Sequence, residues 1–170
     1  GMFWGATLFN GNITSWNVSN AVGVEVPGYG MSRMFNNAAN FNQNISGWII
    51  NSGVTSFLNM FGGATSFDQN LGNWNIAGID TAEDMFLGVT LSTANYSSLL
   101  IGWAADAPIT GPVKFSGGNS QYSAGAAAAA RAELMGSKTE SSDKPFSAQI
   151  CLITCLMCSI SLTKALLNNK

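Results

Sequence analysis

The sequence predicts an α/β solenoid, in which short parallel strands and short helices recur along tandem repeats. One pattern occurs three times without gaps, in residues 2–16, 34–48 and 60–74. It reads Met-Phe-x-x-Ala-x-x-Phe-[Asn/Asp]-x-Asn-[Ile/Leu]-x-x-Trp. A fourth Met-Phe pair follows at 85–86, so the last two spacings between pairs are 26 and 25 residues. This period is typical of one coil in a leucine-rich-repeat-like solenoid, whose apolar side is buried only when coils stack.

Each repeat is expected to contain one short strand directly after its Trp. Side chains alternate between the two faces of a strand, so Trp and the second residue after it share a face. The inward-facing pairs predicted in this way are Trp16/Val18, Trp48/Ile50 and Trp74/Ile76. Strands of stacked coils would then pair in parallel.

A short helix is expected to end near each Met-Phe pair. Phe57, Met60 and Phe61 stand at positions i, i+3 and i+4, which form one face of a helix. Ahead of the fourth pair, Asp80 or Thr81 followed by acidic residues resembles the capping box at a helix start.

An asparagine recurs at the same position of every repeat, as Asn12, Asn44 and Asn70. An inward Asn at a fixed turn can bond backbone groups that no strand or helix satisfies. Alternatively, a row of amides could present polar groups to a ligand. The strict register of these residues with the hydrophobic positions favours the structural role. The first spacing between Met-Phe pairs is longer, and its extra residues fall in 22–30, where Pro27 and glycines predict a loop.

Residues 91–135 are expected to form a C-terminal helical cap over the last hydrophobic layer, as a repeat array requires. The elements expected there are a helix over 91–105, a strand over 113–115, a turn over 117–119 and a second helix over 123–135. Ser92 or Thr93 would cap the first helix. The apolar face of that helix would carry Tyr96, Leu99, Leu100 and Trp103.

Residues 136–170 form an atypical tail, for which a frameshift, a foreign sequence or disorder is the expected explanation. Its segment 150–167 is apolar and holds all three cysteines. A membrane span, a partner-binding helix and meaningless translation are the alternatives, although Lys164 interrupts the roughly 20 apolar residues that a span needs. The cysteines follow C-x3-C-x2-C, an iron–sulfur spacing, but the chain has no room for the barrel that this chemistry needs.

Composition narrows the possible functions. Charged residues make up 9 % of the chain and the net charge is −2, so the basic patch typical of nucleic-acid binding is missing. There is no histidine, the commonest general acid or base, and no Gly-x-Ser-x-Gly motif. We therefore expect a protein that is not an enzyme, holds no cofactor or metal and binds no nucleic acid.

These residues resemble the BspA-like leucine-rich-repeat surface proteins of bacteria and some protists. The matching stretches are MFGGATSF-DQNLGNWNIAGIDTAEDMF and LSTANYSSLLIGW…VKFSGGNSQYSAGAAAAARAEL, and the likeness covers about residues 1–135. It implies an extracellular or cell-surface protein, often adhesive, that binds host or matrix proteins and carries no catalytic residues. Residues 1–90 would then be tandem repeats from a longer solenoid. The insertion at 22–30 departs from the family period.

The leading functional hypothesis is a non-catalytic surface repeat module that mediates adhesion or protein–protein binding. The alternative is a purely structural extracellular spacer in a larger surface protein. The partner would be another protein or an extracellular matrix component. Membrane association would arise only through an anchor outside this sequence or through the 150–167 tail. Solenoids bind along exposed strand surfaces, so the predicted contact face consists of Asn17, Ser19, Ile49, Asn51, Asn75 and Ala77.

Overall fold

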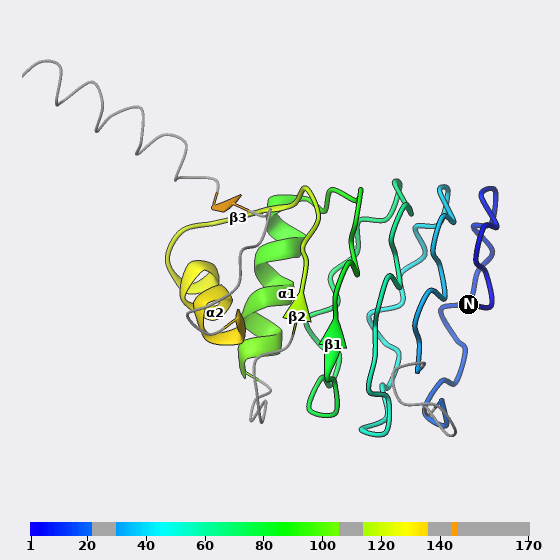
Figure 1. The fold of residues 1–170 in the computed structure, drawn as a ribbon, viewed down its shortest axis with the longest axis horizontal. Helices are drawn as coiled ribbons and strands as arrows, with labels where there is room; N and C mark the ends of the chain where they lie inside the picture. The colour runs from blue at the N-terminus through cyan, green and yellow to red at the C-terminus, as the bar shows by residue number, and fades with distance from the viewer. Residues whose placement is uncertain (22–29, 106–113, 136–143, 146–170) are drawn as a thin grey trace, which may run out of the picture.

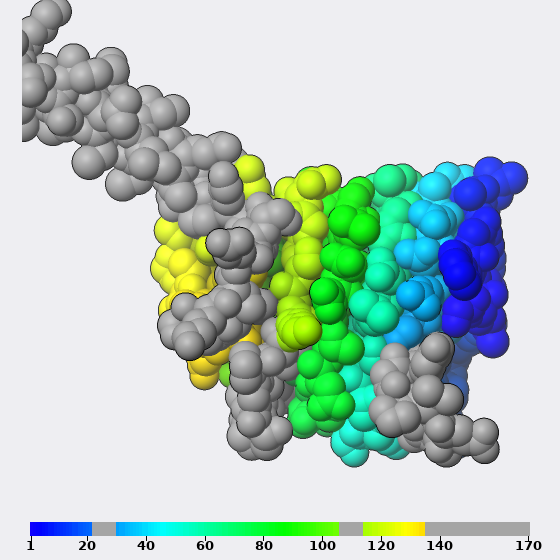
Figure 2. Space-filling model, viewed as in Figure 1, coloured from blue at the N-terminus to red at the C-terminus, as the bar shows by residue number. Residues whose placement is uncertain are grey.

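The computed structural model describes residues 1–21, 30–105, 114–135 and 144–145. It is a mixed arrangement of two helices and short parallel strands around a large buried aromatic cluster. In Figure 1 the successive repeats lie side by side, from the blue N-terminal turn to the two helices at the opposite end. The same order gives the consecutive bands of the space-filling view in Figure 2. Nearly all of the predicted loop at 22–30, and all of the apolar segment 150–167, lie outside the described residues.

Backbone hydrogen bonds join neighbouring repeats at the Met-Phe segments, which are residues 1–5, 31–37, 57–63 and 81–87. The Phe of each repeat donates its N–H to the Met carbonyl of the next repeat, in the pairs Phe3–Met34, Phe35–Met60 and Phe61–Met85, all at 2.9 Å. Two residues later the bond recurs in the pairs Gly5–Asn36, Asn37–Gly62 and Gly63–Leu87, at 2.7–2.8 Å. The equal steps on the donor and acceptor sides show that neighbouring Met-Phe segments run in the same direction.

The strands predicted directly after each Trp are wrong in position. Residues 16–19, 48–51 and 74–77, all of which the structure describes, contain no strand. The inward side chains are nevertheless confirmed in the second and third repeats, since Trp48, Ile50, Trp74 and Ile76 are buried. In the first repeat Trp16 is 42 % exposed and Val18 is half-buried. The alternation therefore reflects burial against the core, while the backbone hydrogen bonds between repeats lie on the Met-Phe side.

The short helices predicted at the Met-Phe pairs are also wrong, because these segments are successions of tight turns. Met60 donates its N–H to the Phe57 carbonyl at 3.0 Å, three residues back. Asn59 has a φ of 52° and Gly63 a φ of 73°, and an α-helix does not tolerate such left-handed residues. The left-handed residue before the Met-Phe pair recurs as Arg33, Asn59 and Asp84, and the one after it as Gly5, Asn37, Gly63 and Gly88.

The predicted capping box at Asp80 or Thr81 is replaced by a strand. Thr81 and Ala82 form β1 (Thr81–Ala82), and Thr81 also makes an isolated parallel bridge to Ser56. The Thr81 hydroxyl oxygen accepts a hydrogen bond from the Glu83 N–H at 3.2 Å. That bond stabilises a turn, and Asp84 follows with a φ of 54°.

Equivalent aromatic rings stack from one repeat to the next and form the core. One column consists of Phe3, Phe35, Phe61 and Phe86, with successive centroids 5.5 Å apart and nearly parallel planes. A second column consists of Phe9, Phe41 and Phe67, at 5.8–5.9 Å. Trp48 and Trp74 stack at 6.4 Å with 2° between their planes. Each buried ring removes roughly 150–250 Å² from water, so these columns supply much of the driving force for folding.

Each buried Trp also bonds the repeat before it. The indole N–H of Trp48 donates to the Ile13 carbonyl at 3.1 Å, and that of Trp74 donates to the Ile45 carbonyl at 3.1 Å. Trp103, from the helix beyond the repeats, makes the same bond to the Leu71 carbonyl at 2.9 Å. The helix therefore continues the Trp positions of the repeats and covers the last of them.

The C-terminal elements follow the sequence prediction closely. Helix α1 (Thr93–Ala105) begins after Ser92, whose hydroxyl accepts from the Asn95 N–H, and it buries the predicted Tyr96, Leu99, Leu100 and Trp103. Strand β2 (Lys114–Phe115) pairs in parallel with β1. The turn expected over 117–119 is present at 118–119, and helix α2 (Ala126–Met135) follows. Strands β3 (Gln121–Tyr122) and β4 (Lys144–Pro145) form a further parallel pair that was not predicted.

Candidate functional site

The predicted contact face is accessible in the structure. Asn17, Ile49, Asn75 and Ala77 are exposed, while Ser19 and Asn51 are half-buried. The structure links the first two repeats on this face directly, because the Asn51 amide donates to the Ser19 carbonyl at 3.0 Å. Ile49 is the most exposed large side chain of the set, at 73 %.

The asparagines of this face hold local turns. The Asn17 side-chain oxygen accepts from the Ser19 N–H at 3.0 Å and from the Ser19 hydroxyl at 2.7 Å. The Asn51 oxygen accepts from the Gly53 N–H at 2.7 Å, and the Asn75 oxygen accepts from the Ala77 N–H at 2.9 Å. Asn side chains commonly close turns in this way. Their amide oxygens are therefore oriented by the fold, which leaves Ile49 and Ala77 as the positions whose side chains make no such bond.

The recurrent Asn12, Asn44 and Asn70 make the same kind of turn. The Asn44 oxygen accepts from the Ser46 N–H at 3.0 Å, and the Asn70 oxygen accepts from the Gly72 N–H at 2.8 Å. The predicted structural role is confirmed, but the predicted inward orientation is wrong, because all three residues are exposed. An Asn that closes a turn at the surface bonds only the backbone of that turn, so its side chain does not have to point into the core.

A second polar row was missed by the sequence analysis. The Asn42 N–H donates to the Asn10 side-chain oxygen at 3.0 Å, and the Asp68 N–H donates to the Asn42 side-chain oxygen at 2.9 Å. Asp68 then accepts from the Ser92 N–H at 2.8 Å. The signal was present as the [Asn/Asp] position of the repeat pattern. The row runs across successive repeats and ends on the start of α1.

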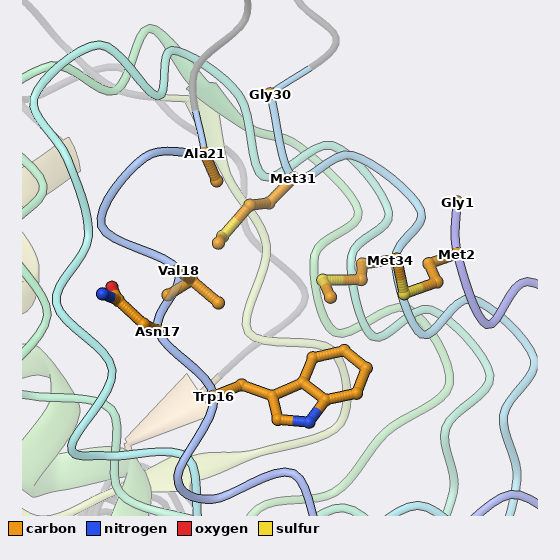
Figure 3. A pocket seen from close by; sticks show the side chains of 9 residues that line it. All are labelled: Gly1, Met2, Trp16, Asn17, Val18, Ala21, Gly30, Met31 and Met34. Atoms are coloured by element: carbon orange, nitrogen blue, oxygen red, sulfur yellow. The ribbon is translucent and has the colours of Figure 1, made fainter.

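A pocket of about 340 Å³ opens at the N-terminal end of the molecule. Its lining residues are Gly1, Met2, Trp16, Asn17, Val18, Ala21, Gly30, Met31 and Met34. Figure 3 shows the Trp16 indole on one side of the space, with Met31 and Met34 across from it. The pocket shares Asn17 with the predicted contact face. Sequence reasoning did not find it, because the repeat pattern treats Trp16 as a buried residue.

The pocket reflects how little of the described chain covers Trp16, which is 42 % exposed. In the third repeat Phe57, three residues before Met60, packs against Trp74 with ring centroids 5.5 Å apart, and Trp74 is fully buried. Met31 is the corresponding residue of the second repeat, whose Trp is Trp48, so it does not stand to Trp16 as Phe57 stands to Trp74.

Arg33 lies in the sequence between the lining residues Met31 and Met34. The Arg33 guanidinium stands over the Trp4 ring, 5.8 Å from its centroid, in cation–π geometry. Burial, and secondarily the Arg33 charge, lower the pKa of the Gly1 amino group from its ordinary value, and this group donates to the Ser32 carbonyl at 3.3 Å.

Within the described residues no three His, Cys, Asp or Glu side chains gather closely enough to hold a metal ion. Of the helices described, none is both long and apolar enough to pass through a membrane.

The repeats and the first turns of α1 match one protein-family model, over residues 1–99. The chain belongs to the DUF285 family. This family is described as a Mycoplasma protein of unknown function. No curated protein and no solved structure matches the chain. The DUF285 match spans all three copies of the repeat pattern and the fourth Met-Phe pair, so it covers the predicted contact face and all the lining residues of the pocket.

Proposed function

We propose that this chain is a BspA-like, non-catalytic repeat module at the cell surface or outside the cell, which binds another protein or a matrix component. The architecture we propose is a leucine-rich-repeat-like solenoid. Its support is the recurrence of the same backbone bonds and ring stacks between every pair of neighbouring repeats. An array of this kind offers one extended row of equivalent outward positions to a partner.

The exposure of Ile49 carries the binding proposal. This side chain is 73 % exposed between Trp48 and Ile50, which are both buried. An apolar side chain held outward by two buried neighbours is rigidly placed, and a rigid anchor loses little entropy on binding. Asn17 and Asn75, fixed by their turns, would supply oriented amide groups beside it.

The test replaces the two positions whose side chains the fold does not use. Ile49→Arg combined with Ala77→Arg should weaken binding to immobilised, purified extracellular matrix proteins by about tenfold or more, the loss expected for an anchor residue. Solid-phase binding with the isolated chain measures the effect. Leu87→Arg is the matched control, since Leu87 is also exposed and lies on a Met-Phe segment.

The outcomes separate binding from misfolding. Circular dichroism should give the same spectrum and the same unfolding temperature for both Arg variants, because neither replaces a turn asparagine. Binding that survives the double substitution, or falls equally with Leu87→Arg, would reject the contact face.

A structural spacer is the second candidate, and the turn asparagines favour it. A backbone N–H two residues later donates to the side-chain oxygen in each of Asn17, Asn51 and Asn75. A spacer needs such self-contained turns and no anchor residue. It would retain no matrix protein in the binding assay, with or without the Arg substitutions.

A further inference from the structure

We propose that Asn10 is a site of spontaneous deamidation, and that the second repeat accelerates the reaction by donating two hydrogen bonds to the Asn10 side-chain oxygen. Asn10 is followed by Gly11, and this is the one Asn-Gly pair in the sequence. Both residues are exposed. The inference concerns chemistry within the chain itself and does not depend on the proposed function.

The reaction needs no partner other than water. The Gly11 backbone nitrogen attacks the Asn10 Cγ atom, a new C–N bond forms, and the Nδ2 nitrogen leaves as ammonia. A base in solution takes the proton from the Gly11 nitrogen, and the leaving nitrogen gains a proton from water. Water then opens the resulting succinimide ring at one of its two carbonyls, which gives aspartate or isoaspartate at position 10. No atom is oxidised or reduced.

The nitrogen that attacks and the nitrogen that leaves are both accessible. Glycine has no Cβ, so the Gly11 nitrogen can approach a neighbouring group with little hindrance and through a wide range of backbone conformations. Among the described residues neither the Gly11 N–H nor the Asn10 Nδ2 has a hydrogen-bond partner. The reaction therefore breaks no hydrogen bond of the fold at either nitrogen.

The Asn10 Oδ1 atom accepts two hydrogen bonds from the second repeat. The Asn42 backbone N–H donates at 3.0 Å, and the Gln43 Nε2 amide donates at 2.9 Å. When the nitrogen attacks Cγ, this oxygen takes up the developing negative charge. Donors already placed at such an oxygen stabilise the transition state, as in the oxyanion holes of enzymes. The folded chain therefore has an activating arrangement that the unfolded chain lacks.

The other repeats hold the same position without the same reactivity. Asn42 accepts the equivalent pair of bonds, from the Asp68 N–H at 2.9 Å and from the Gln69 amide at 2.7 Å. The residue after Asn42 is Gln43, whose side chain hinders attack by its backbone nitrogen. Asn42 is exposed although a repeat lies on each side of it, so exposure at this position does not come from the end of the array.

The two products differ in how well they fit the fold. Aspartate at position 10 keeps a side-chain oxygen for the donors of the second repeat, and Asp68 shows a carboxylate at this position accepting a backbone N–H at 2.8 Å. Isoaspartate lengthens the main chain by one carbon shortly before Ile13, whose carbonyl accepts from the Trp48 indole at 3.1 Å. Isoaspartate is therefore expected to disturb the junction between the first two repeats, and aspartate to preserve it.

The experiment follows the reaction in the full chain, folded in buffer and unfolded in guanidinium chloride, at the same mildly alkaline pH and temperature. Peptide mass spectrometry measures the fraction of residue 10 converted to aspartate or isoaspartate over time. The folded chain should react about 3–10 times faster than the unfolded chain, less than the roughly 10²–10³-fold effect of one oxyanion-hole donor in an enzyme, because water also reaches this exposed oxygen.

Gln43→Met removes one of the two donors at nearly the same side-chain length. Its rate in the folded chain should fall by about threefold or more, and its rate in guanidinium chloride should not change, since residues 43 and 10 meet only in the folded chain. Gln69→Met is the matched control, because it removes the equivalent bond to Asn42 and should leave the rate at Asn10 unchanged. Gly11→Gln, which copies the residue of the second repeat, should slow the reaction in both states.

A folded chain that reacts no faster than the unfolded chain would overturn the proposal, and this comparison needs no substitution. An unchanged rate in Gln43→Met, with a circular dichroism spectrum that shows the variant to be folded, would overturn it as well.

Discussion

At the scale of single residues, each buried Trp serves both as core and as a directional bond. Trp74 is fully buried, and its indole N–H donates to the Ile45 carbonyl at 3.1 Å. Trp16 stands at the same position of its repeat but is 42 % exposed, and its indole has no partner among the described residues. The Trp side chain is therefore buried and hydrogen-bonded in the third repeat, but partly exposed and without a hydrogen bond among the described residues in the first.

Trp74→Phe should destabilise the chain by about 2–4 kcal/mol, because it leaves a cavity and a buried carbonyl without its donor. Trp16→Phe should change the free energy of unfolding by less than about 1 kcal/mol, since the lost atoms are half in water already. Urea unfolding followed by circular dichroism measures both. Equal losses for the two variants would contradict the assigned role of the indole bond.

The sequence predicted the inward side of the repeats at this scale but not the conformation of the Met-Phe segments. Phe57, Met60 and Phe61 are all buried, as a helical face would be. The spacing arises instead from a turn that returns the chain after three residues, with Asn59 in the left-handed region at φ 52°. Burial at i, i+3 and i+4 is common to both conformations. Only the left-handed residue separates them, and Arg33 and Asp84 hold that position without being the expected glycine.

At the scale of elements, the N-terminal end of α1 is bonded to the third repeat by the carboxylate of Asp68. A single Asp68 oxygen accepts from the Ser92 N–H at 2.8 Å, from the Ser92 hydroxyl at 3.0 Å and from the Asn95 amide at 2.8 Å. The negative charge also lies at the helix N-terminus, where the helix dipole favours it. The third repeat thus supplies the group that fixes the start of the helix.

Asp68→Ala should destabilise the chain by about 1–3 kcal/mol, through the loss of these charge-assisted bonds at a helix start. Asp80→Ala is the matched control, because Asp80 is an exposed carboxylate with no side-chain partner among the described residues. Thermal unfolding followed by circular dichroism compares the two. Asp68→Asn should lie between them, as Asn42 fills the same position in its own repeat.

The sequence predicted α1 and α2 well because a helix shows its own period and its cap residue locally. The two-residue strands were not predicted, because nothing in their local sequence marks them as strands. Strand β1 becomes a strand only through partners far along the chain, Ser56 on one side and Lys114 on the other. The end pocket escaped for a related reason, since it depends on what neighbours Trp16 rather than on the Trp itself.

At the scale of the whole molecule, we expect the stabilising interactions to act only between neighbouring repeats. Phe35 stacks on Phe3 and Phe61 at 5.5 Å, and Phe61 stacks in turn on Phe86. Phe3 and Phe86 therefore stand at opposite ends of one column, separated by two rings. An array of this kind behaves as a sum of repeat energies and nearest-neighbour terms.

Double-mutant cycles test this expectation. Phe35→Leu combined with Phe61→Leu should show a coupling of about 0.5 kcal/mol or more, because the two rings are in contact. Phe3→Leu combined with Phe86→Leu should be additive within about 0.5 kcal/mol, because the rings are distant. Urea unfolding of the four single and two double variants gives both couplings. Strong coupling of the distant pair would mean that the molecule unfolds as one indivisible core.

The indole bond that reaches one repeat back has an implication for how such a gene can change length. A deletion or duplication that runs from one Trp to the next removes or adds one indole N–H together with one Ile or Leu carbonyl that accepts it. Each junction between the remaining repeats then has the same donor and acceptor as before. In-frame unequal recombination between copies would thus add or remove whole units without creating an unmatched junction. The terminal helix, which ends the series with its own Trp103, would keep the array closed on that side however many units preceded it.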